Sequence, residues 1–311
     1  MRRENEQRGS RRPSQRIKTL ELHQFANTEF ETRKFAAVIT VLKIFINNLK
    51  LKKSSTKRDV YYHDVALFQK SQVFANDIME IIADSFHFSL ENDLNVYPSQ
   101  KGLIYAELSM QDQGRIWNAS EPVLIPRSSS FDILCSPRGI IIIEKDAIFR
   151  SFCDYVRSLE LNLIIITGKG FPDEKTKRFV QYLSRRFPSV PMLGFMDSDI
   201  YGLSILKNFK YTKDFSLNIC PQLRLAGVFL LEYSQGWLDI SPREWKMMVN
   251  FIRDLRRQKA VSIPELKELN VWHREVTRGL ILFKKSEMNI IETCPNVYML
   301  KKLSMCIQQS T

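Results

Sequence analysis

Two kinds of hydrophobic pattern divide the chain. In its first third, apolar positions recur at the three- and four-residue spacing of amphipathic helices, which predicts helices over residues 28–50, 56–70 and 72–88. Further on, unbroken apolar runs alternate with helical segments, as in GIIIIE at 139–144 and NLIIIT at 162–167. A strand covered on both faces of a sheet is apolar throughout, so this second pattern predicts β–α–β units around a parallel sheet.

Short strand-like runs separate these two regions. LIYAEL at 103–108 and FDILC at 131–135 follow the third predicted helix, and helices followed by a small β element suit a winged-helix module. Beyond residue 236 the pattern is helical again. It predicts a capped helix that starts at Ser241 and a second helix over 274–292.

These patterns predict an α/β fold in three parts. Residues 1–27 are expected to form a basic, disordered tail, because the first 18 residues carry seven basic and two acidic side chains and almost no apolar ones. Residues 28–130 form a helical, winged-helix domain, and residues 131–311 form the α/β domain with its C-terminal helices. We therefore expect more than one domain, in keeping with the length of 311 residues.

Composition favours a globular protein with a polyanionic partner. Lys and Arg number 46 against 34 Asp and Glu, giving a net charge of +12, and such an excess attracts nucleic acid. The five cysteines are scattered without a C-x-x-C pair, which argues against a disulfide framework or a zinc site. No apolar run approaches the roughly 18 residues that cross a bilayer, so we expect no membrane partner.

Three carboxylates are placed at one edge of the predicted sheet. Glu144 ends the GIIII strand, and Asp197 and Asp199 follow the strand MLGFM. Ligands bind beyond the carboxyl ends of parallel strands, and hard oxygen ligands are what Mg²⁺ bound to phosphate requires. Acidic pairs in loops commonly cap helices instead, and Asp199 is placed to cap a helix that starts near Gly202.

One tyrosine has a chemically suitable neighbour. Arg58 and Tyr62 are four residues apart, which places them on one helical face. A protonated phenol is a poor nucleophile, and a guanidinium stabilises both the phenolate and the phosphorus transition state formed on attack. A Tyr-Tyr pair in a helix is nevertheless more often a packing feature. His63 points about 100° away from Tyr62 and is given no catalytic role.

Five motifs occur in a recognisable order along the chain: RDVYYHD at 58–64, KGLI at 101–104, IIEKDA at 142–147, ITGKGFPD at 166–173 and DSDIYG at 197–202. Together they resemble the type IIB topoisomerase family, which comprises the meiotic double-strand-break transesterase and the topoisomerase VI A subunit. The resemblance implies a CAP-like winged-helix domain followed by a Toprim domain. Ile200 stands where the family commonly has proline, and this puts the rigidity of that loop in doubt.

The resemblance also implies an activity and its residues. Tyr62 is expected to form a 5′-phosphotyrosyl bond with the assistance of Arg58, while Glu144, Asp197 and Asp199 hold Mg²⁺. The implied function is a Mg²⁺-dependent DNA transesterase that makes meiotic double-strand breaks and so initiates homologous recombination. The family acts as a homodimer, in which the tyrosine of one protomer faces the metal site of the other.

DNA contacts and partners follow from the same resemblance. Lys101 is expected in the wing, and Lys169 and Phe171 in the loop near the metals, where lysines neutralise phosphates and an aromatic ring stacks on or wedges against a base step. The chain has no Gly-rich ATP-binding signature, so we expect a topoisomerase VI B-like subunit, together with other break-forming accessory proteins. The helix at 28–50 is the candidate docking element, and the nuclear chromosome is the expected location.

Three alternatives stay open at the level of sequence. Within the family, the alternative is the A subunit of an ATP-dependent topoisomerase VI, which breaks and reseals duplex DNA; the basic tail and the variant D-x-D motif favour the meiotic protein. A Toprim nuclease or primase would need no tyrosine. A non-catalytic DNA-binding module would retain the fold alone.

Overall fold

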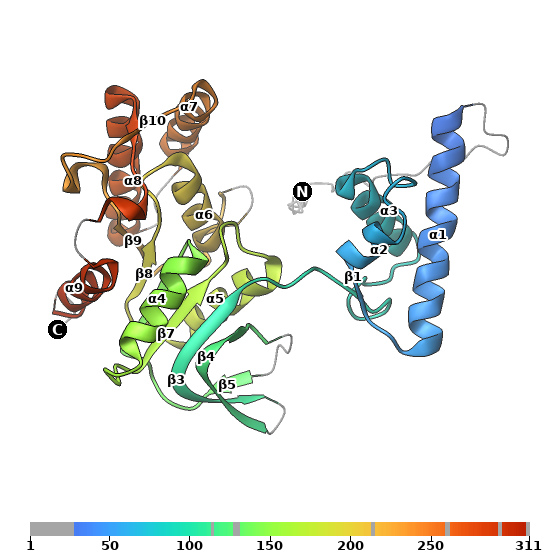
Figure 1. Ribbon diagram of the computed structural model, residues 1–311, viewed down its shortest axis with the longest axis horizontal. Helices are drawn as coiled ribbons and strands as arrows, with labels where there is room; N and C mark the ends of the chain where they lie inside the picture. Colours follow the sequence, from blue (N-terminus) through green and yellow to red (C-terminus); the bar gives the residue numbers. More distant parts are fainter. Residues whose placement is uncertain are drawn as a thin grey trace, which may run out of the picture. The chain divides into compact units, whose positions relative to one another are not determined.

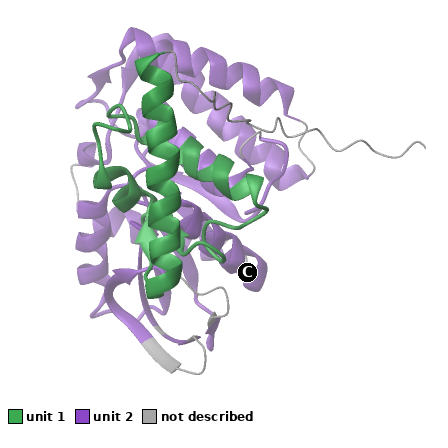
Figure 2. Ribbon diagram, turned by 90° about the vertical axis from the view of Figure 1, so that its right-hand side faces the viewer, with its two compact units in different colours: residues 1–99 green, residues 100–311 purple. Residues whose placement is uncertain are grey.

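The computed structural model describes residues 28–112, 115–126, 131–212, 215–258, 262–291 and 294–308 (Figure 1). The tail predicted at 1–27 lies outside these residues. The chain forms two compact units, residues 1–99 and 100–311 (Figure 2). The domain boundary expected at residue 130 therefore falls inside the second unit. None of the described helices combines the length and apolar character needed to cross a bilayer.

The first unit is built on three helices that share one core. The helices are α1 (Glu29–Leu51), α2 (Lys57–His63) and α3 (Gln72–Ser85). A short parallel pair of strands, β1 (Ser55–Thr56) and β2 (Val96–Tyr97), joins the segment between α1 and α2 to the segment that follows α3. Val41 and Phe45 of α1 belong to the same buried cluster as Ile78 and Met79 of α3. The helices predicted at 28–50 and 72–88 are confirmed.

The second predicted helix is shorter than its apolar spacing indicated. It begins with a capping box between Thr56 and Asp59 and ends at His63. The carboxylate of Asp64 then accepts a hydrogen bond of 2.9 Å from the backbone N–H of Leu67, which is a turn that competes with helix. Tyr62 consequently lies near the end of a helix of two turns.

The second unit is built on a seven-stranded sheet with the order β4-β3-β7-β6-β8-β9, in which β5 also pairs with β3. The strands are β3 (Leu103–Asp112), β4 (Arg115–Leu124), β5 (Phe131–Ile133), β6 (Gly139–Ile143), β7 (Leu163–Thr167), β8 (Met192–Phe195) and β9 (Leu223–Gly227). Strands β6 to β9 run parallel, as the apolar runs predicted. The runs expected to form a separate wing lie in this sheet instead, because β3 pairs antiparallel with β7.

The apolar strands are covered on both faces. Ile140 and Ile142 of β6 belong to one buried cluster, which includes side chains of α5 (Glu174–Arg186), α6 (Ile200–Lys210), α7 (Pro242–Arg257) and α8 (Ile263–Leu282). Ile141 and Ile143 belong to another, with side chains of α4 (Asp146–Val156) and α9 (Pro295–Gln308). Successive side chains of a strand point to opposite faces, so the isoleucine run fills both layers.

The C-terminal region differs from the prediction in one functionally important segment. Ser241 caps α7 as expected, but the helix predicted at 274–292 is α8, which ends at Leu282. The chain continues as β11 (Lys284–Lys285), paired with β10 (Leu238–Asp239), and then as a 3-10 turn, η2 (Met288–Ile290). Helix is lost because Ser286 exchanges backbone hydrogen bonds with Ser198, of 2.8 and 3.2 Å.

Candidate active site at the carboxyl edge of the sheet

Glu144 and Asp197 meet at the carboxyl ends of neighbouring parallel strands. Glu144 directly follows β6, and Asp197 lies two residues beyond β8. The Glu144 Oε2 atom accepts a hydrogen bond of 3.0 Å from the backbone N–H of Asp197. The sheet register thus brings together two residues that are far apart in the sequence, as the strand-end argument predicted.

Asp199 has the helix-capping role that its spacing allowed. Its Oδ1 atom accepts a hydrogen bond of 2.7 Å from the N–H of Gly202 in the first turn of α6. A Cβ atom on Gly202 would lie 2.3 Å from the backbone oxygen of Asp197, so this position requires glycine. Ile200 occupies the first helical position, where proline is also favoured, and its buried side chain anchors the turn instead.

The three carboxyl groups share an environment that disfavours their negative charges. Burial, together with the charges of Asp197 and Asp199, raises the pKa of Glu144 to about 7. Burial also raises the pKa of Asp197 and of Asp199, against the hydrogen bonds that those carboxylates accept. A cation placed among these groups would relieve the repulsion.

Residues that the sequence did not single out complete this edge. The backbone N–H of Met288 donates a hydrogen bond of 2.8 Å to Oδ1 of Asp197. The ammonium of Lys145 lies 3.1 Å from Oδ2 of Asp197 and 2.8 Å from Oε2 of Glu287. Local sequence patterns gave no sign of Met288 or Glu287, because their segment was predicted to be helical.

The donor atoms suit a hard divalent cation, although the described residues contain no preformed cage of three acidic, histidine or cysteine side chains. Oxygen donors from Glu144, Asp197 and Asp199 gather at one edge, where their charges destabilise one another. Both oxygens of Asp197 already have partners in Met288 and Lys145. The Lys145 ammonium supplies part of the positive charge that the carboxylates require.

The TGKG loop brings the predicted DNA contacts next to Glu144. Gly170, at a φ of +81°, donates its N–H to the backbone oxygen of Glu144 at 3.1 Å. The ammonium of Lys101 lies 3.4 Å from the backbone oxygen of Lys169, and Phe171 is 45% exposed. Lys101 lies just before β3 rather than in a separate wing, so all three residues belong to the same unit as the acids.

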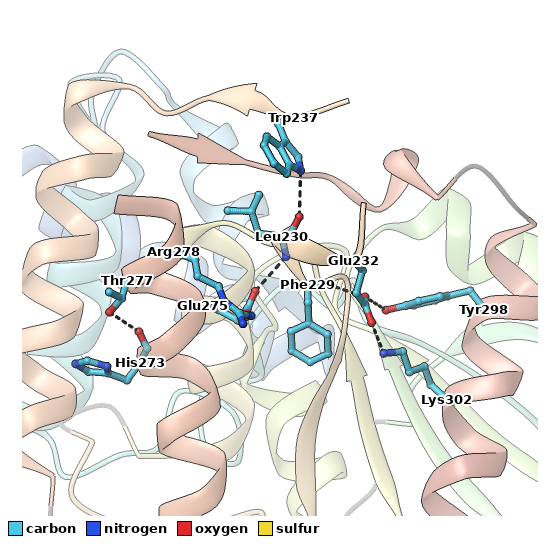
Figure 3. Close-up of polar contacts among 10 residues, drawn as sticks. All are labelled: Phe229, Leu230, Glu232, Trp237, His273, Glu275, Thr277, Arg278, Tyr298 and Lys302. Carbon is cyan, nitrogen blue, oxygen red and sulfur yellow. Dashed lines mark hydrogen bonds and ion pairs between the residues drawn. The ribbon is translucent and has the colours of Figure 1, made fainter. Parts of the chain in front are cut away.

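The loop after β9 starts beside this edge, where the N–H of Val228 bonds to the backbone oxygen of Met196, the residue before Asp197. Side chains of the C-terminal helices fix the loop (Figure 3). The Glu232 carboxylate accepts a hydrogen bond of 2.6 Å from the Tyr298 hydroxyl and pairs with Lys302 of α9. Buried Glu275 of α8 accepts the N–H of Leu230 at 3.1 Å. These contacts hold the loop against the body of the second unit.

Tyr62 and Arg58 lie in the first unit, on α2. The Tyr62 side chain is 65% exposed, whereas Tyr61 is partly buried, with its ring centroid 6.4 Å from that of Phe68. Arg58 is exposed four residues before Tyr62. The second tyrosine of the pair is therefore the accessible one, while the first contributes to packing.

Comparison with known proteins identifies both units. Residues 139–303 match the family model for the Toprim domain of Spo11 and the topoisomerase 6 A subunit, while residues 33–96 match the model "Type IIB DNA topoisomerase".

The chain is 27% identical to meiosis-specific protein SPO11 of Saccharomyces cerevisiae, over 85% of this chain and 73% of that protein. It is 30% identical to meiotic recombination protein rec12 of Schizosaccharomyces pombe, over 78% of this chain and 68% of that protein. The human meiotic recombination protein SPO11 is 29% identical, over 58% of this chain and 46% of its own length. The chain therefore belongs to the family that unites Spo11 with the topoisomerase VI A subunit, whose Toprim domain it shares.

Proposed function

We propose that this protein is a DNA transesterase that makes double-strand breaks in meiosis and so initiates homologous recombination. Its relatives in two yeasts are named as meiotic proteins. The observation that carries the proposal is the meeting of Glu144, Asp197 and Asp199 at one edge of a Toprim sheet, in a chain that also presents an exposed tyrosine. Such a protein would act on chromosomes in the nucleus.

The proposed chemistry begins with Tyr62. Its phenolic oxygen attacks the phosphorus of a DNA phosphodiester, a bond forms between this oxygen and phosphorus, and the bond from phosphorus to the 3′ oxygen breaks. The phenolic proton is released, and the leaving 3′ oxygen takes up a proton. The products are a 5′-phosphotyrosyl bond and a free 3′-hydroxyl. Arg58 would stabilise the charge that develops on the phenolate and the phosphorus.

The acids of the second unit would hold Mg²⁺. Glu144, Asp197 and Asp199 provide the oxygen donors, and the strand ends and the α6 cap fix their backbones. When bound, Mg²⁺ supplies charge neutralisation at the phosphate and positions the leaving 3′ oxygen. The protein itself orients the carboxylates and excludes water from Asp197, whose side chain is buried.

Duplex DNA is the proposed substrate, and both units would contact it. The first unit, with α2 and α3, would act as the winged-helix-like module that presents Tyr62. In the second unit, Lys101 and Lys169 would neutralise phosphates next to the acids. Exposed Phe171 would stack on or wedge against a base step.

A homodimer and a B-type partner complete the proposal. In the active dimer, Tyr62 of one protomer would act with the acidic edge of its partner. On α1, Phe35, Ile46 and Leu49 are exposed and Ile39 and Leu42 are partly exposed, which forms an apolar stripe with alternating four- and three-residue spacing. This stripe suits packing against a helix of a topoisomerase VI B-like subunit, with other break-forming accessory proteins joining the complex.

A covalent-adduct assay tests the proposal. The protein and its B-type partner are incubated with Mg²⁺ and 3′-labelled duplex DNA, denatured, and examined for label that migrates with protein. We expect the wild type and Tyr61→Phe to form the adduct, and Tyr62→Phe to lose it. An adduct that persists in Tyr62→Phe would refute the nucleophile assignment.

The same assay separates the alternatives. A metal-dependent nuclease would cut DNA in the Tyr62→Phe variant and leave no protein on the ends. A topoisomerase VI A subunit would reseal its breaks when Mg²⁺ is chelated before denaturation, whereas the adducts of a meiotic break-forming enzyme should persist. A non-catalytic module would bind DNA without cutting it in any variant.

A further inference from the structure

We propose that Glu287 is a positioning residue that gives the Lys145 ammonium a second carboxylate partner and so keeps Asp197 available to a divalent cation. This inference rests on the proposed metal role of the acidic edge. Lys145 lies between two carboxylates, 2.8 Å from Oε2 of Glu287 and 3.1 Å from Oδ2 of Asp197. Glu287 is therefore a fourth acidic group at this edge, linked to Asp197 through a shared lysine.

The two carboxylates that contact Lys145 differ in their exposure to solvent. The Asp197 side chain is 8% exposed, while that of Glu287 is 42% exposed. A buried oxygen that is paired with an ammonium has less negative charge left for a metal ion, and two cations at one oxygen repel each other. Lys145 and a divalent cation therefore compete for Oδ2 of Asp197. Glu287 gives the lysine a second carboxylate partner. The ammonium of Lys145 therefore keeps one ion pair when Oδ2 of Asp197 binds a metal ion instead of the lysine.

Backbone pairing fixes Glu287 in this position. Ser286, the preceding residue, exchanges hydrogen bonds with Ser198, the middle residue of the D-S-D motif. Met288, the following residue, donates its N–H to Oδ1 of Asp197. Because both neighbours of Glu287 are tied to the motif that contains Asp197, the distance from Glu287 to Lys145 does not depend on a flexible loop.

Removing each end of the ion pair has opposite effects in this arrangement. In Glu287→Gln the lysine keeps Asp197 as its carboxylate partner, so metal affinity should fall, by about tenfold if it behaves like other residues that orient metal ligands. In Lys145→Met the competing cation is gone, so metal affinity should rise. The double variant should resemble Lys145→Met, because Glu287 acts only through the lysine.

Binding of Mn²⁺ measured by electron paramagnetic resonance, with the full chain and without DNA, provides a readout independent of cleavage. Glu232→Gln is the matched control, since it breaks the Lys302–Glu232 ion pair in the loop after β9 and leaves Lys145 untouched (Figure 3). We expect unchanged Mn²⁺ affinity in this control. The proposal is overturned if Glu287→Gln binds as tightly as the wild type, or if Lys145→Met binds more weakly.

The metal assignment itself has its own test in the same titration. If Asp197→Asn binds Mn²⁺ as the wild type does, Asp197 is not a ligand and both proposals fail. If Asp197→Asn loses binding while Glu287→Gln keeps it, only the positioning role fails. A destabilised Glu287→Gln protein would be recognised by its thermal unfolding, and the increase expected for Lys145→Met still decides the question.

Discussion

The carboxylate of Asp197 accepts a hydrogen bond of 2.8 Å from the backbone N–H of Met288, which lies 91 positions further along the chain. This bond joins the end of β8 to η2, two elements that neither pack as neighbouring strands nor follow each other in sequence. It gives a buried carboxylate a fixed donor and sets the direction in which its other oxygen points. A change of the backbone at Met288 should therefore alter the environment of the Asp197 carboxylate.

Replacing Met288 by proline should remove the donor while keeping the backbone shape. Met288 is the first residue of η2, and the extended backbone of Glu287 is compatible with a following proline. We expect Met288→Pro to be less stable than Met288→Ala by about 2 kcal/mol, because a buried charged acceptor loses a hydrogen bond. Urea unfolding of the two variants measures this difference, and equal midpoints with equal slopes would contradict it.

Stability should fall as the pH rises toward neutrality in the absence of metal. The pKa of Glu144 is about 7, raised from 4.5 by burial and by the charges of Asp197 and Asp199. The folded chain therefore binds this proton more tightly than the unfolded chain. The contribution to stability is fully present below about pH 4.5 and is lost as the pH passes through 7, by at most about 3 kcal/mol.

The variant Glu144→Gln isolates this effect. Free energies of unfolding are measured from pH 5 to 8 in EDTA for both proteins. The wild type should lose stability relative to Glu144→Gln across this range, and Mg²⁺ should offset the loss in the wild type if it binds the folded acids. Parallel profiles for the two proteins in EDTA would show that Glu144 does not titrate as stated.

Gly202→Ala should destabilise the second unit even though alanine is the better helix former. A Cβ atom at this position would lie 2.3 Å from the backbone oxygen of Asp197, so the first turn of α6 must shift. We expect a loss of about 2 kcal/mol or more, which exceeds the helix-propensity gain of up to about 1 kcal/mol. Ser204→Ala in the same helix is the control and should change stability little. Thermal unfolding compares them, and a Gly202→Ala protein as stable as the wild type would refute the close approach.

Neutralising Lys101 or Lys169 should weaken binding to DNA in a salt-dependent way. If each ammonium contacts a phosphate, Lys101→Ala or Lys169→Ala should each lower the slope of log K against log salt by about 1. Arg178→Ala is the control, because Arg178 is exposed on α5 and pairs with Glu174. Fluorescence anisotropy with duplex DNA over a range of salt gives these slopes. Slopes that match the wild type would remove both lysines from the interface.

Phe171→Ala is expected to behave differently from the lysine variants. An exposed ring that stacks on a base contributes about 1–3 kcal/mol without releasing counterions. Affinity should therefore fall while the salt slope stays unchanged. An unaltered affinity would indicate that Phe171 serves only the packing of its loop.

The parts of the site that follow from strand geometry could be predicted from sequence. The run Ile140–Ile143 is apolar at every position because both faces of β6 are buried, and that alone places Glu144 at a strand end. The apolar run at β8 places Asp197 beside it. The capping role of Asp199 also follows from local spacing.

Contacts that depend on long-range pairing could not be predicted in the same way. The apolar spacing of 274–292 resembles a helix, and nothing local indicates that Ser286 will pair with Ser198. Met288, Glu287 and the role of Lys145 were missed for this reason. The segment of β3 was assigned to a separate wing for the same reason: its partner β7 lies about sixty residues later, and the local sequence does not indicate this pairing. Hydrophobic periodicity reports which face of an element is buried, and not which distant backbone it meets.

The pairing of Ser286 with Ser198 has a consequence for the order of events during translation. The ribosome releases β6 and β8 with their acids well before η2. The sheet can therefore begin to fold while Asp197 still lacks the N–H of Met288 and Lys145 still lacks its second partner, Glu287. The acidic edge is therefore completed later than the sheet that carries it. A nascent chain in which only the strands have emerged would have all three carboxylates without the contacts that Met288 and Glu287 make at the finished edge.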